Sequence, residues 1–201
     1  MLQHIYLIRH GETDWNREGR AQGQHDVQLN GKGREQARQI GAFLAGILPA
    51  ALISSGLSRA RETAEIIGYS LGLEPVIHPE LRERDMGKFS GLTRQEIQAY
   101  GVTDLSHWDG LPGVETDEDL LKRVLPCLQQ FIGTNDGDGV VITHGGVIRV
   151  LFDHFMGINT KEHRRFALHN GLVAVFQINK GHFMLESLVY PELIKLMGLP
   201  I

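Results

Sequence analysis

The sequence predicts an α/β fold built on a mainly parallel sheet, because short apolar runs alternate with segments of helical spacing. The apolar runs at 2–8, 51–55, 75–79 and 140–143 have the length of strands. Between most of these runs, apolar residues recur every three or four positions, as they do in helices. Strands that alternate with helices usually pair in parallel through crossover connections.

The first half of the chain contains two expected helices. After the first strand, a polar loop rich in Gly and Gln runs to about Asn30. The helix that follows carries its apolar residues at Ala37, Ile40, Phe43, Leu44 and Ile47. The second helix is expected from Ser58 to Leu71, and Gly72 is a suitable residue to end it.

The second half begins with an irregular stretch at 81–115 that includes a short helix near Arg94–Tyr100. A helix is expected from Glu115 to Phe131, with Pro126 kinking or interrupting it. Another apolar helix follows His144 and ends near Met156.

An antiparallel hairpin is expected near the end of the chain. The runs at 172–178 and 183–189 flank Asn179-Lys180-Gly181, which is a good hairpin turn. The last ten residues form either a short docked helix or a loose tail.

Composition indicates one globular domain over residues 1–201. This length suits a single buried core, and the sequence contains no repeat, low-complexity tract or linker. The formal net charge of −4 argues against a nucleic-acid or membrane-surface protein, and no apolar stretch is long enough to span a bilayer. The N-terminus lacks the pattern of a secretory signal, and a single cysteine fits a reducing compartment, so we expect a cytoplasmic protein.

Three of the predicted strands end in residues suited to binding an anion. Strand 2–8 leads into Arg9-His10-Gly11, strand 51–54 leads to Arg59 in the first turn of a helix, and strand 140–143 leads into His144-Gly145-Gly146. Parallel strands would bring these ends to one edge, where open α/β sheets bind ligands. Two helix N-termini at this edge would add backbone N–H donors. Singly, each residue has a simpler interpretation as a solvated arginine, a packed histidine or a turn residue.

The sequence also resembles a known family through five motifs in order. LIRHGETDWN at 7–16 and VVITHGGVIR at 140–149 are similar to the two histidine motifs of the histidine phosphatase (phosphoglycerate mutase-like) superfamily. Between them lie SSGLSRARETAE at 54–65, LRERDMGKFSG at 81–91 and LPGVETDEDLLKRV at 111–124. The resemblance implies a three-layer sandwich in which helices flank a mixed, mainly parallel sheet.

The resemblance assigns roles to residues of this chain. It implies that His10 is a nucleophile that forms a phosphohistidine, with Arg9, Arg59 and His144 holding the phosphoryl group. It further implies that Glu83 is the general acid and base. The implied additional contacts to phosphate come from Asn16, Gln22, Gly23 and Gly145. Two alternatives stay open, since Asn16 could be a loop cap and Glu83 could pair with Arg82 or Arg84.

No cofactor and no metal are expected. The other eight histidines show no ligand spacing with Asp, Glu or Cys, and Cys127 is interpreted as a packing residue in a helix.

Hydrolysis of small phosphomonoesters is the expected activity. Related mutases are longer in the region that corresponds to 92–115, and they carry a tyrosine where this chain has Met86. A short segment here suggests an open mouth, with residues 84–115 as a lid or specificity insertion. Phosphoglycerate mutase-type transfer and a non-catalytic phosphate- or phosphopeptide-binding module remain alternatives, and a homodimer stays open. The side chains that could line the mouth, or equally form the core of the lid, are Phe89, Trp108, Leu111 and Val114.

Overall fold

One six-stranded sheet forms the centre of the molecule. The structure, a computed structural model, describes residues 2–102, 108, 110–157 and 167–196. The strand order is β3-β2-β4-β1-β5-β6. The strands are β1 (Leu2–Arg9), β2 (Ala51–Ser54), β3 (Val76–Ile77), β4 (Gly137–Thr143), β5 (Val173–Asn179) and β6 (His182–Val189). Strands β1, β2, β3 and β4 pair in parallel, whereas β5 runs antiparallel to both β1 and β6. The predicted mixed, mainly parallel sheet is confirmed.

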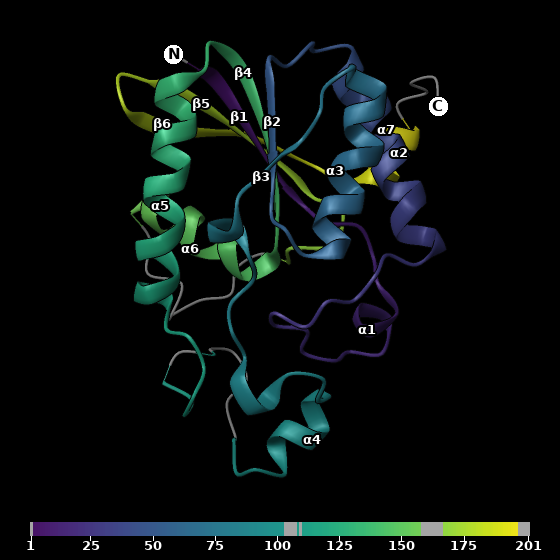
Figure 1. The fold of residues 1–201 in the computed structure, drawn as a ribbon, viewed down its shortest axis with the longest axis vertical. Helices are drawn as coiled ribbons and strands as arrows, with labels where there is room; N and C mark the ends of the chain where they lie inside the picture. Colours follow the sequence, from purple (N-terminus) through teal and green to yellow (C-terminus); the bar gives the residue numbers. More distant parts are fainter. Residues whose placement is uncertain (1, 103–107, 109, 158–166, 197–201) are drawn as a thin grey trace.

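Helices cover both faces of this sheet and make the three layers (Figure 1). One layer contains α5 (Asp117–Thr134) and α6 (Gly145–Met156), and the other contains α2 (Gly31–Ala45), α3 (Ser58–Leu71) and α7 (Pro191–Leu196). Strand β1 is buried on both sides: Ile5 and Leu7 pack into the core under α5 and α6, while Tyr6 and Ile8 pack into the core under α2 and α3. Burial on both faces explains why this strand reads as a continuous apolar run.

One predicted strand is shorter in the structure, and one short helix was not predicted. Strand β3 covers only two residues of the run 75–79, because Pro79 opens a 3-10 turn, η1 (Pro79–Leu81). The loop before Asn30 contains a short helix, α1 (Asp14–Arg17), that the apolar pattern did not predict. A reciprocal pair of hydrogen bonds between Thr13 and Asn16 starts this helix, so local capping specifies it rather than apolar spacing.

Pro126 does not interrupt α5, contrary to one expected outcome. The helix continues from Asp117 to Thr134 with Pro126 inside it. Proline removes one N–H donor, so the carbonyl of Lys122 loses its partner within the helix. Both residues lie on the exposed side of α5, where water can satisfy that carbonyl.

The β5–β6 hairpin and the C-terminal segment both match an expected outcome. The β5–β6 turn has positive φ at Lys180 (50°) and Gly181 (80°), as a two-residue hairpin of the primed type requires. Of the two outcomes left open for the C-terminus, the docked helix is found: α7 packs against α2, and Ile194 is buried. None of the helices among the described residues has the length and apolar character needed to cross a membrane.

The described residues 84–102 and 110–115 form an extension beyond the carboxyl edge of the sheet, at the bottom of Figure 1. It contains the 3-10 turn η2 (Gly87–Phe89) and the predicted short helix, α4 (Arg94–Gln98). Four buried side chains give the extension a small core of its own, namely Met86, Phe89, Ile97 and Val114. Backbone bonds between Ala21 and Leu92 (2.9 Å) and between Gly91 and Ala21 (2.7 Å) attach it to the loop after β1. The extension therefore stands directly over the edge where the three predicted strand ends meet.

Candidate active site

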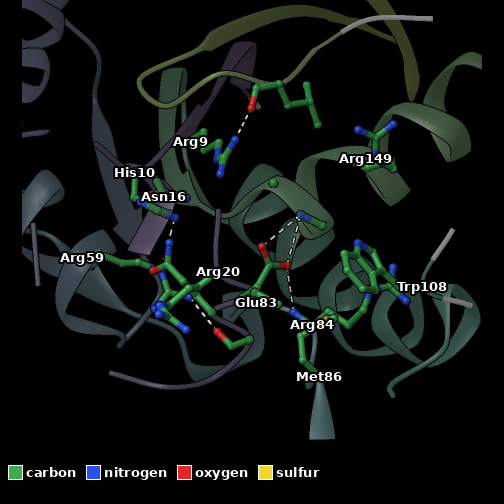
Figure 2. Close-up of a pocket in the computed structure, with 16 residues that line it drawn as sticks. Arg9, His10, Asn16, Arg20, Arg59, Glu83, Arg84, Met86, Trp108 and Arg149 are labelled. Carbon is green, nitrogen blue, oxygen red and sulfur yellow. Dashed lines mark hydrogen bonds between the residues drawn. The ribbon is translucent and has the colours of Figure 1, made fainter. Parts of the chain in front are cut away.

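The carboxyl ends of β1, β2 and β4 lie together, as the parallel pairing requires. His10 directly follows β1, and its backbone N–H donates to the carbonyl of Thr143 at the end of β4 (3.0 Å). The ring centroids of His10 and His144 are 5.1 Å apart. Figure 2 shows His10 and Arg59 converging on one side of the pocket, with Arg9 close by.

One hydrogen bond fixes the protonation pattern of His10. Its Nδ1 lies 2.7 Å from the carbonyl oxygen of Gly11. A carbonyl only accepts, so Nδ1 carries the proton and Nε2 is left with a lone pair. On the other side, Nε2 lies 3.2 Å from Nε of Arg59, which donates to it. The ring nitrogen with a lone pair is therefore Nε2, and a ligand that bound to it would take the place of the Arg59 donor.

The surroundings of both histidines favour their neutral form. Burial lowers the pKa of His10 well below 6.5, and the charges of Arg59 and Arg9 lower it further, against the opposing effect of the Gly11 carbonyl. Burial also lowers the pKa of His144 well below 6.5, with Arg59 as the next cause. A bound phosphate dianion would act in the opposite direction on both rings. A neutral His10 is the form that a nucleophile requires.

Arg59 is fully buried and connects three parts of the site. Besides the bond to His10, its Nη1 and Nη2 donate to the carbonyls of His25 and Gly23, each at 2.7 Å. These three bonds use three of the five N–H groups of a guanidinium, so two stay available for a ligand. Burial lowers the pKa of Arg59 to about 10, still far above neutrality. The residue thus holds the loop after β1 in place and keeps a positive charge beside His10.

Arg9 and His144 each combine an anchored atom with an unpaired one. Nη1 of Arg9 donates to the carbonyl of Leu168, while its buried Nε has no hydrogen-bond partner among the described residues. Nε2 of His144 lies 2.9 Å from the hydroxyl of Ser55, and its buried Nδ1 is likewise unpartnered within the described part of the chain. Unpaired buried polar atoms are costly, so they mark places where a polar ligand would be stabilised.

Glu83 reaches the same pocket from the segment after η1. Its carboxylate accepts hydrogen bonds from the N–H of Arg84 (2.8 Å) and from the N–H of Gly146, which lies 3.1 Å from both oxygens. The alternative pairing with Arg84 is wrong, because the Arg84 guanidinium binds Asp117 and the Glu115 carbonyl instead. The N-terminus of α6 was expected to offer its backbone N–H groups to an anionic ligand. In the structure, the N–H of Gly146 donates to the Glu83 carboxylate instead.

The four predicted contact residues Asn16, Gln22, Gly23 and Gly145 all line this pocket. Asn16 also serves as the alternative cap: its Oδ1 accepts from the N–H of Thr13 (3.2 Å) and from Nδ2 of Asn170 (3.0 Å). Gln22 is buried, and its Oε1 has no partner among the described residues. The arrangement places cations and neutral donors, with a single carboxylate, around the Nε2 lone pair of His10.

Comparison with known proteins identifies the family. The model of the histidine phosphatase superfamily (branch 1) matches residues 5–190. The chain belongs to the histidine phosphatase superfamily. It is 36% identical over 196 residues to a protein named probable phosphoglycerate mutase GpmB from Salmonella paratyphi C (strain RKS4594), covering 94% of this chain and 91% of the relative.

Solved structures show the same fold. A mycobacterial glucosyl-3-phosphoglycerate phosphatase in complex with VO3 superposes with a TM-score of 0.85 at 25% identity, covering 92% of this chain and 98% of the other. YhfR of Bacillus stearothermophilus gives a TM-score of 0.83 at 28% identity, covering 92% and 95% of the two chains. The names of these relatives include both a phosphatase and a mutase of this superfamily.

The far wall of the histidine phosphatase pocket is only partly apolar. Trp108 and Met86 line it, as Figure 2 shows. Phe89 and Val114 are instead buried in the core of the extension, and Leu111 packs against that core without lining the pocket. Positive side chains make up much of the remaining wall, namely Arg20, Arg84 and Arg149. Both outcomes were left open for these four side chains: Trp108 lines the pocket, and the other three belong to the core of the extension or pack against it.

Four residues that support the site were not singled out from the sequence. Ser55, which binds His144, directly follows strand β2 and could have been found by the strand-end argument. Thr63 lies one turn after Arg59 and accepts from the N–H of Gly11 (3.1 Å). Arg123 and Asn170 reach the site from distant segments: Arg123 donates to the Glu83 carbonyl (3.0 Å), and Asn170 to the carbonyl of His10 (3.2 Å). No local pattern marks the last two.

Cys127 is buried in α5 and packs in the core, as expected. Burial raises the pKa of its thiol to about 11, so it is no reactive nucleophile. The structure nevertheless brings it close to His78 and Glu80, a grouping that sequence spacing did not reveal.

Proposed function

We propose that this chain is a phosphatase that hydrolyses small phosphomonoesters through a phosphohistidine on His10. The observation that carries the proposal is the state of His10: its Nδ1 proton is held by the Gly11 carbonyl, and its Nε2 lone pair lies in a pocket with Arg9 and Arg59. This combination gives a neutral nucleophile next to fixed positive charge, which is what attack on a phosphate dianion requires.

The first half of the reaction transfers the phosphoryl group to the enzyme. Nε2 of His10 forms a bond to phosphorus while the bond between phosphorus and the ester oxygen breaks. The carboxyl group of Glu83 gives its proton to the departing oxygen, and the alcohol leaves. The guanidinium groups of Arg9 and Arg59 stabilise the charge on the three non-bridging oxygens.

The second half returns the enzyme to its starting state. The Glu83 carboxylate takes a proton from water, and the resulting hydroxide oxygen bonds to phosphorus as the phosphorus–nitrogen bond breaks. Inorganic phosphate leaves, with Glu83 protonated and His10 neutral again. No step in this scheme requires a metal ion.

Hydrolysis is favoured over mutase transfer by the wall opposite His10. Met86 stands there where related mutases carry a tyrosine, and the short extension leaves less protein to retain a substrate beside the phosphohistidine. The relative named as a probable phosphoglycerate mutase makes transfer the second candidate. Release of inorganic phosphate from 3-phosphoglycerate, compared with formation of 2-phosphoglycerate, separates the two.

The decisive experiment is hydrolysis of p-nitrophenyl phosphate in the presence of EDTA. We expect turnover by the folded protein, inhibition by vanadate, and a loss of roughly 10³-fold or more in His10→Ala. Phosphoenzyme trapped from a labelled substrate should resist alkali and hydrolyse in acid, as a phosphorus–nitrogen bond does. A folded protein without turnover across a range of pH would refute the proposal and leave the binding-module alternative.

Substrate preference is proposed to depend on Arg149 and Trp108. Arg149 lines the pocket from α6, where burial has a larger effect on its pKa than the opposing charges of Asp153, Asp117 and Glu83, which raise it. Removing a guanidinium from water lowers its pKa, and burial is the first cause of the lowered pKa of Arg149. We therefore expect Arg149 to contact a second anionic group of the substrate, while Trp108 packs against its carbon skeleton.

A further inference from the structure

Three side chains with metal-binding atoms gather outside the phosphatase pocket. One ligand atom each from His78, Glu80 and Cys127 lie within 4.8 Å of one another. Nδ1 of His78 and Oε2 of Glu80 are 3.9 Å apart. None of the three lines the pocket of His10 or takes part in the proposed reaction.

The backbone holds this group together from two distant segments. His78 and Glu80 belong to the turn around η1, where the N–H of His78 donates to the carbonyl of Ser54 at the end of β2 (2.8 Å). Cys127 lies in the middle of α5. One helical turn before it, Arg123 donates to the carbonyls of Glu80 and Arg82, which ties the turn to the helix. The residues are therefore placed together by packing and hydrogen bonds on either side of them.

The donor set suits a borderline-soft divalent cation. Imidazole nitrogen, thiolate sulfur and carboxylate oxygen are the three ligand types that zinc takes in proteins. Zinc bonds of about 2.0–2.3 Å in a tetrahedron place the ligand atoms roughly 3.3–3.8 Å apart. The observed separations need to shorten by at most about 1.5 Å, which side-chain rotation provides.

We propose that His78, Glu80 and Cys127 bind one zinc-class divalent cation, with water as the fourth ligand. The thiolate and the carboxylate together balance its two positive charges. On binding, the ion takes the place of the thiol proton, which leaves to solvent. Glu80 is half exposed and His78 is 31% exposed, and His78 also lines a surface groove, so the ion has a route from solvent.

The position of the site gives the ion a structural effect on the enzyme. Glu83 follows η1 by two residues, and Arg123 already holds the Glu83 carbonyl. A cation that joins the turn to α5 would fasten the base of the segment that carries the proposed general acid. It would stabilise the fold without touching the substrate, so chelation leaves the reaction itself possible.

The sharpest test uses cobalt as a spectroscopic substitute for zinc in tag-free, full-length protein that has first been stripped of metal. Cys127 is the only cysteine of the sequence, so a thiolate-to-cobalt charge-transfer band can arise from this residue alone. Cobalt held by the paired histidines of the active site would show no such band. We expect one equivalent of cobalt to produce the band and one equivalent of zinc to remove it.

Variants decide whether the other two residues complete the site. His78→Gln should weaken zinc binding by roughly 10²-fold in competition with a chromophoric chelator, and should abolish the rise in Tm that zinc gives the wild type. His182→Gln, an exposed histidine on β6, is the matched control and should bind zinc as the wild type does. His78→Gln keeps Cys127, so the test does not depend on whether Cys127→Ser folds.

Two results would overturn the proposal. Cobalt binding without a thiolate band would mean an adventitious ion on surface histidines. A thiolate band that is unchanged in both His78→Gln and Glu80→Gln would mean a lone thiol contact rather than a built site.

Discussion

Gly146 provides a way to move the proposed general acid without changing its chemistry. A Cβ added at this position would lie 2.3 Å from Oε1 of Glu83 and 3.3 Å from its carboxyl carbon. Ordinary contact needs roughly 3.5 Å, so the carboxylate of Glu83 must retreat by about 1 Å in Gly146→Ala. The atom in the way is the far end of a flexible side chain, and alanine is a better helix former than glycine, so the fold should keep its stability.

The displacement of the Glu83 carboxylate should lower the catalytic rate. The N–H of Gly146 lies 3.1 Å from both carboxylate oxygens, and those hydrogen bonds position the acid in the pocket. A misplacement of about 1 Å can cost about 10²-fold in rate, which corresponds to about 2.7 kcal/mol of transition-state stabilisation. The cost applies where the leaving group needs a proton. We therefore expect kcat/KM to fall about 10²-fold for an alkyl phosphate and only a few-fold for p-nitrophenyl phosphate.

The assay compares the two leaving groups in Gly146→Ala and in a matched variant, Gly31→Ala. Gly31 is also in the first turn of a helix, and a Cβ added there meets nothing within 4 Å. Gly31→Ala should leave both rates unchanged, and thermal unfolding should confirm that each variant folds. Equal losses on both leaving groups, or an alkyl phosphatase activity like that of the wild type, would refute the role of Gly146 in positioning Glu83.

Three further outcomes are expected. Glu83→Gln should slow hydrolysis of an alkyl phosphate by roughly 10²–10⁴-fold and that of p-nitrophenyl phosphate far less, because only the poor leaving group requires the acid. Arg149→Met should lower kcat/KM about tenfold for phosphomonoesters with a carboxylate or second phosphate and leave p-nitrophenyl phosphate within about twofold; the same loss on both would contradict a substrate-specific contact. The free energy of unfolding in urea should fall as the pH is lowered from about 7.5 to about 5. The native pKa values of His10 and His144 lie well below the unfolded value near 6.5, so the unfolded chain binds more protons in that window. His144→Gln should make this fall shallower, and an unchanged slope would argue against a neutral His144.

The centre of the sheet could be predicted because strands β1, β4 and β5 are largely buried. Strand β1 reads as one apolar run since its alternate residues pack into two different cores. The parallel order then brings the three polar strand ends together without further information. Helix α1 was not predicted because it has only four residues, and a capping box rather than apolar spacing specifies it. The effect of Pro126 on α5 was not predicted correctly. Proline is tolerated there because that face of the helix is exposed, and this exposure depends on how the molecule packs.

The site could be predicted only as far as local signals reach. His10 and Arg59 occupy positions that a strand end and a helix start define, so the pattern located them. The partners of Arg59 could not be found in this way, because Gly23 and His25 contribute carbonyls, and every residue has one. Asn170 approaches from a segment 160 residues further along the chain, and its role depends on where β5 begins. Long-range hydrogen bonds to backbone atoms leave no trace in residue type.

The two halves of the site are held in physically different ways. Register within the parallel sheet positions His10 and His144, so a change that preserves β1 and β4 should preserve the position of the proposed nucleophile. The proposed acid, Glu83, comes from a segment without regular structure, and individual hydrogen bonds from Gly146, Arg84 and Arg123 hold it. The extension that follows this segment supplies Met86 and Trp108 to the pocket wall. If the proposed mechanism holds, substitutions there should change which alcohol leaves and how well it is protonated, while the proposed phosphoryl acceptor His10 stays fixed. One sheet edge could then serve phosphatases and mutases alike.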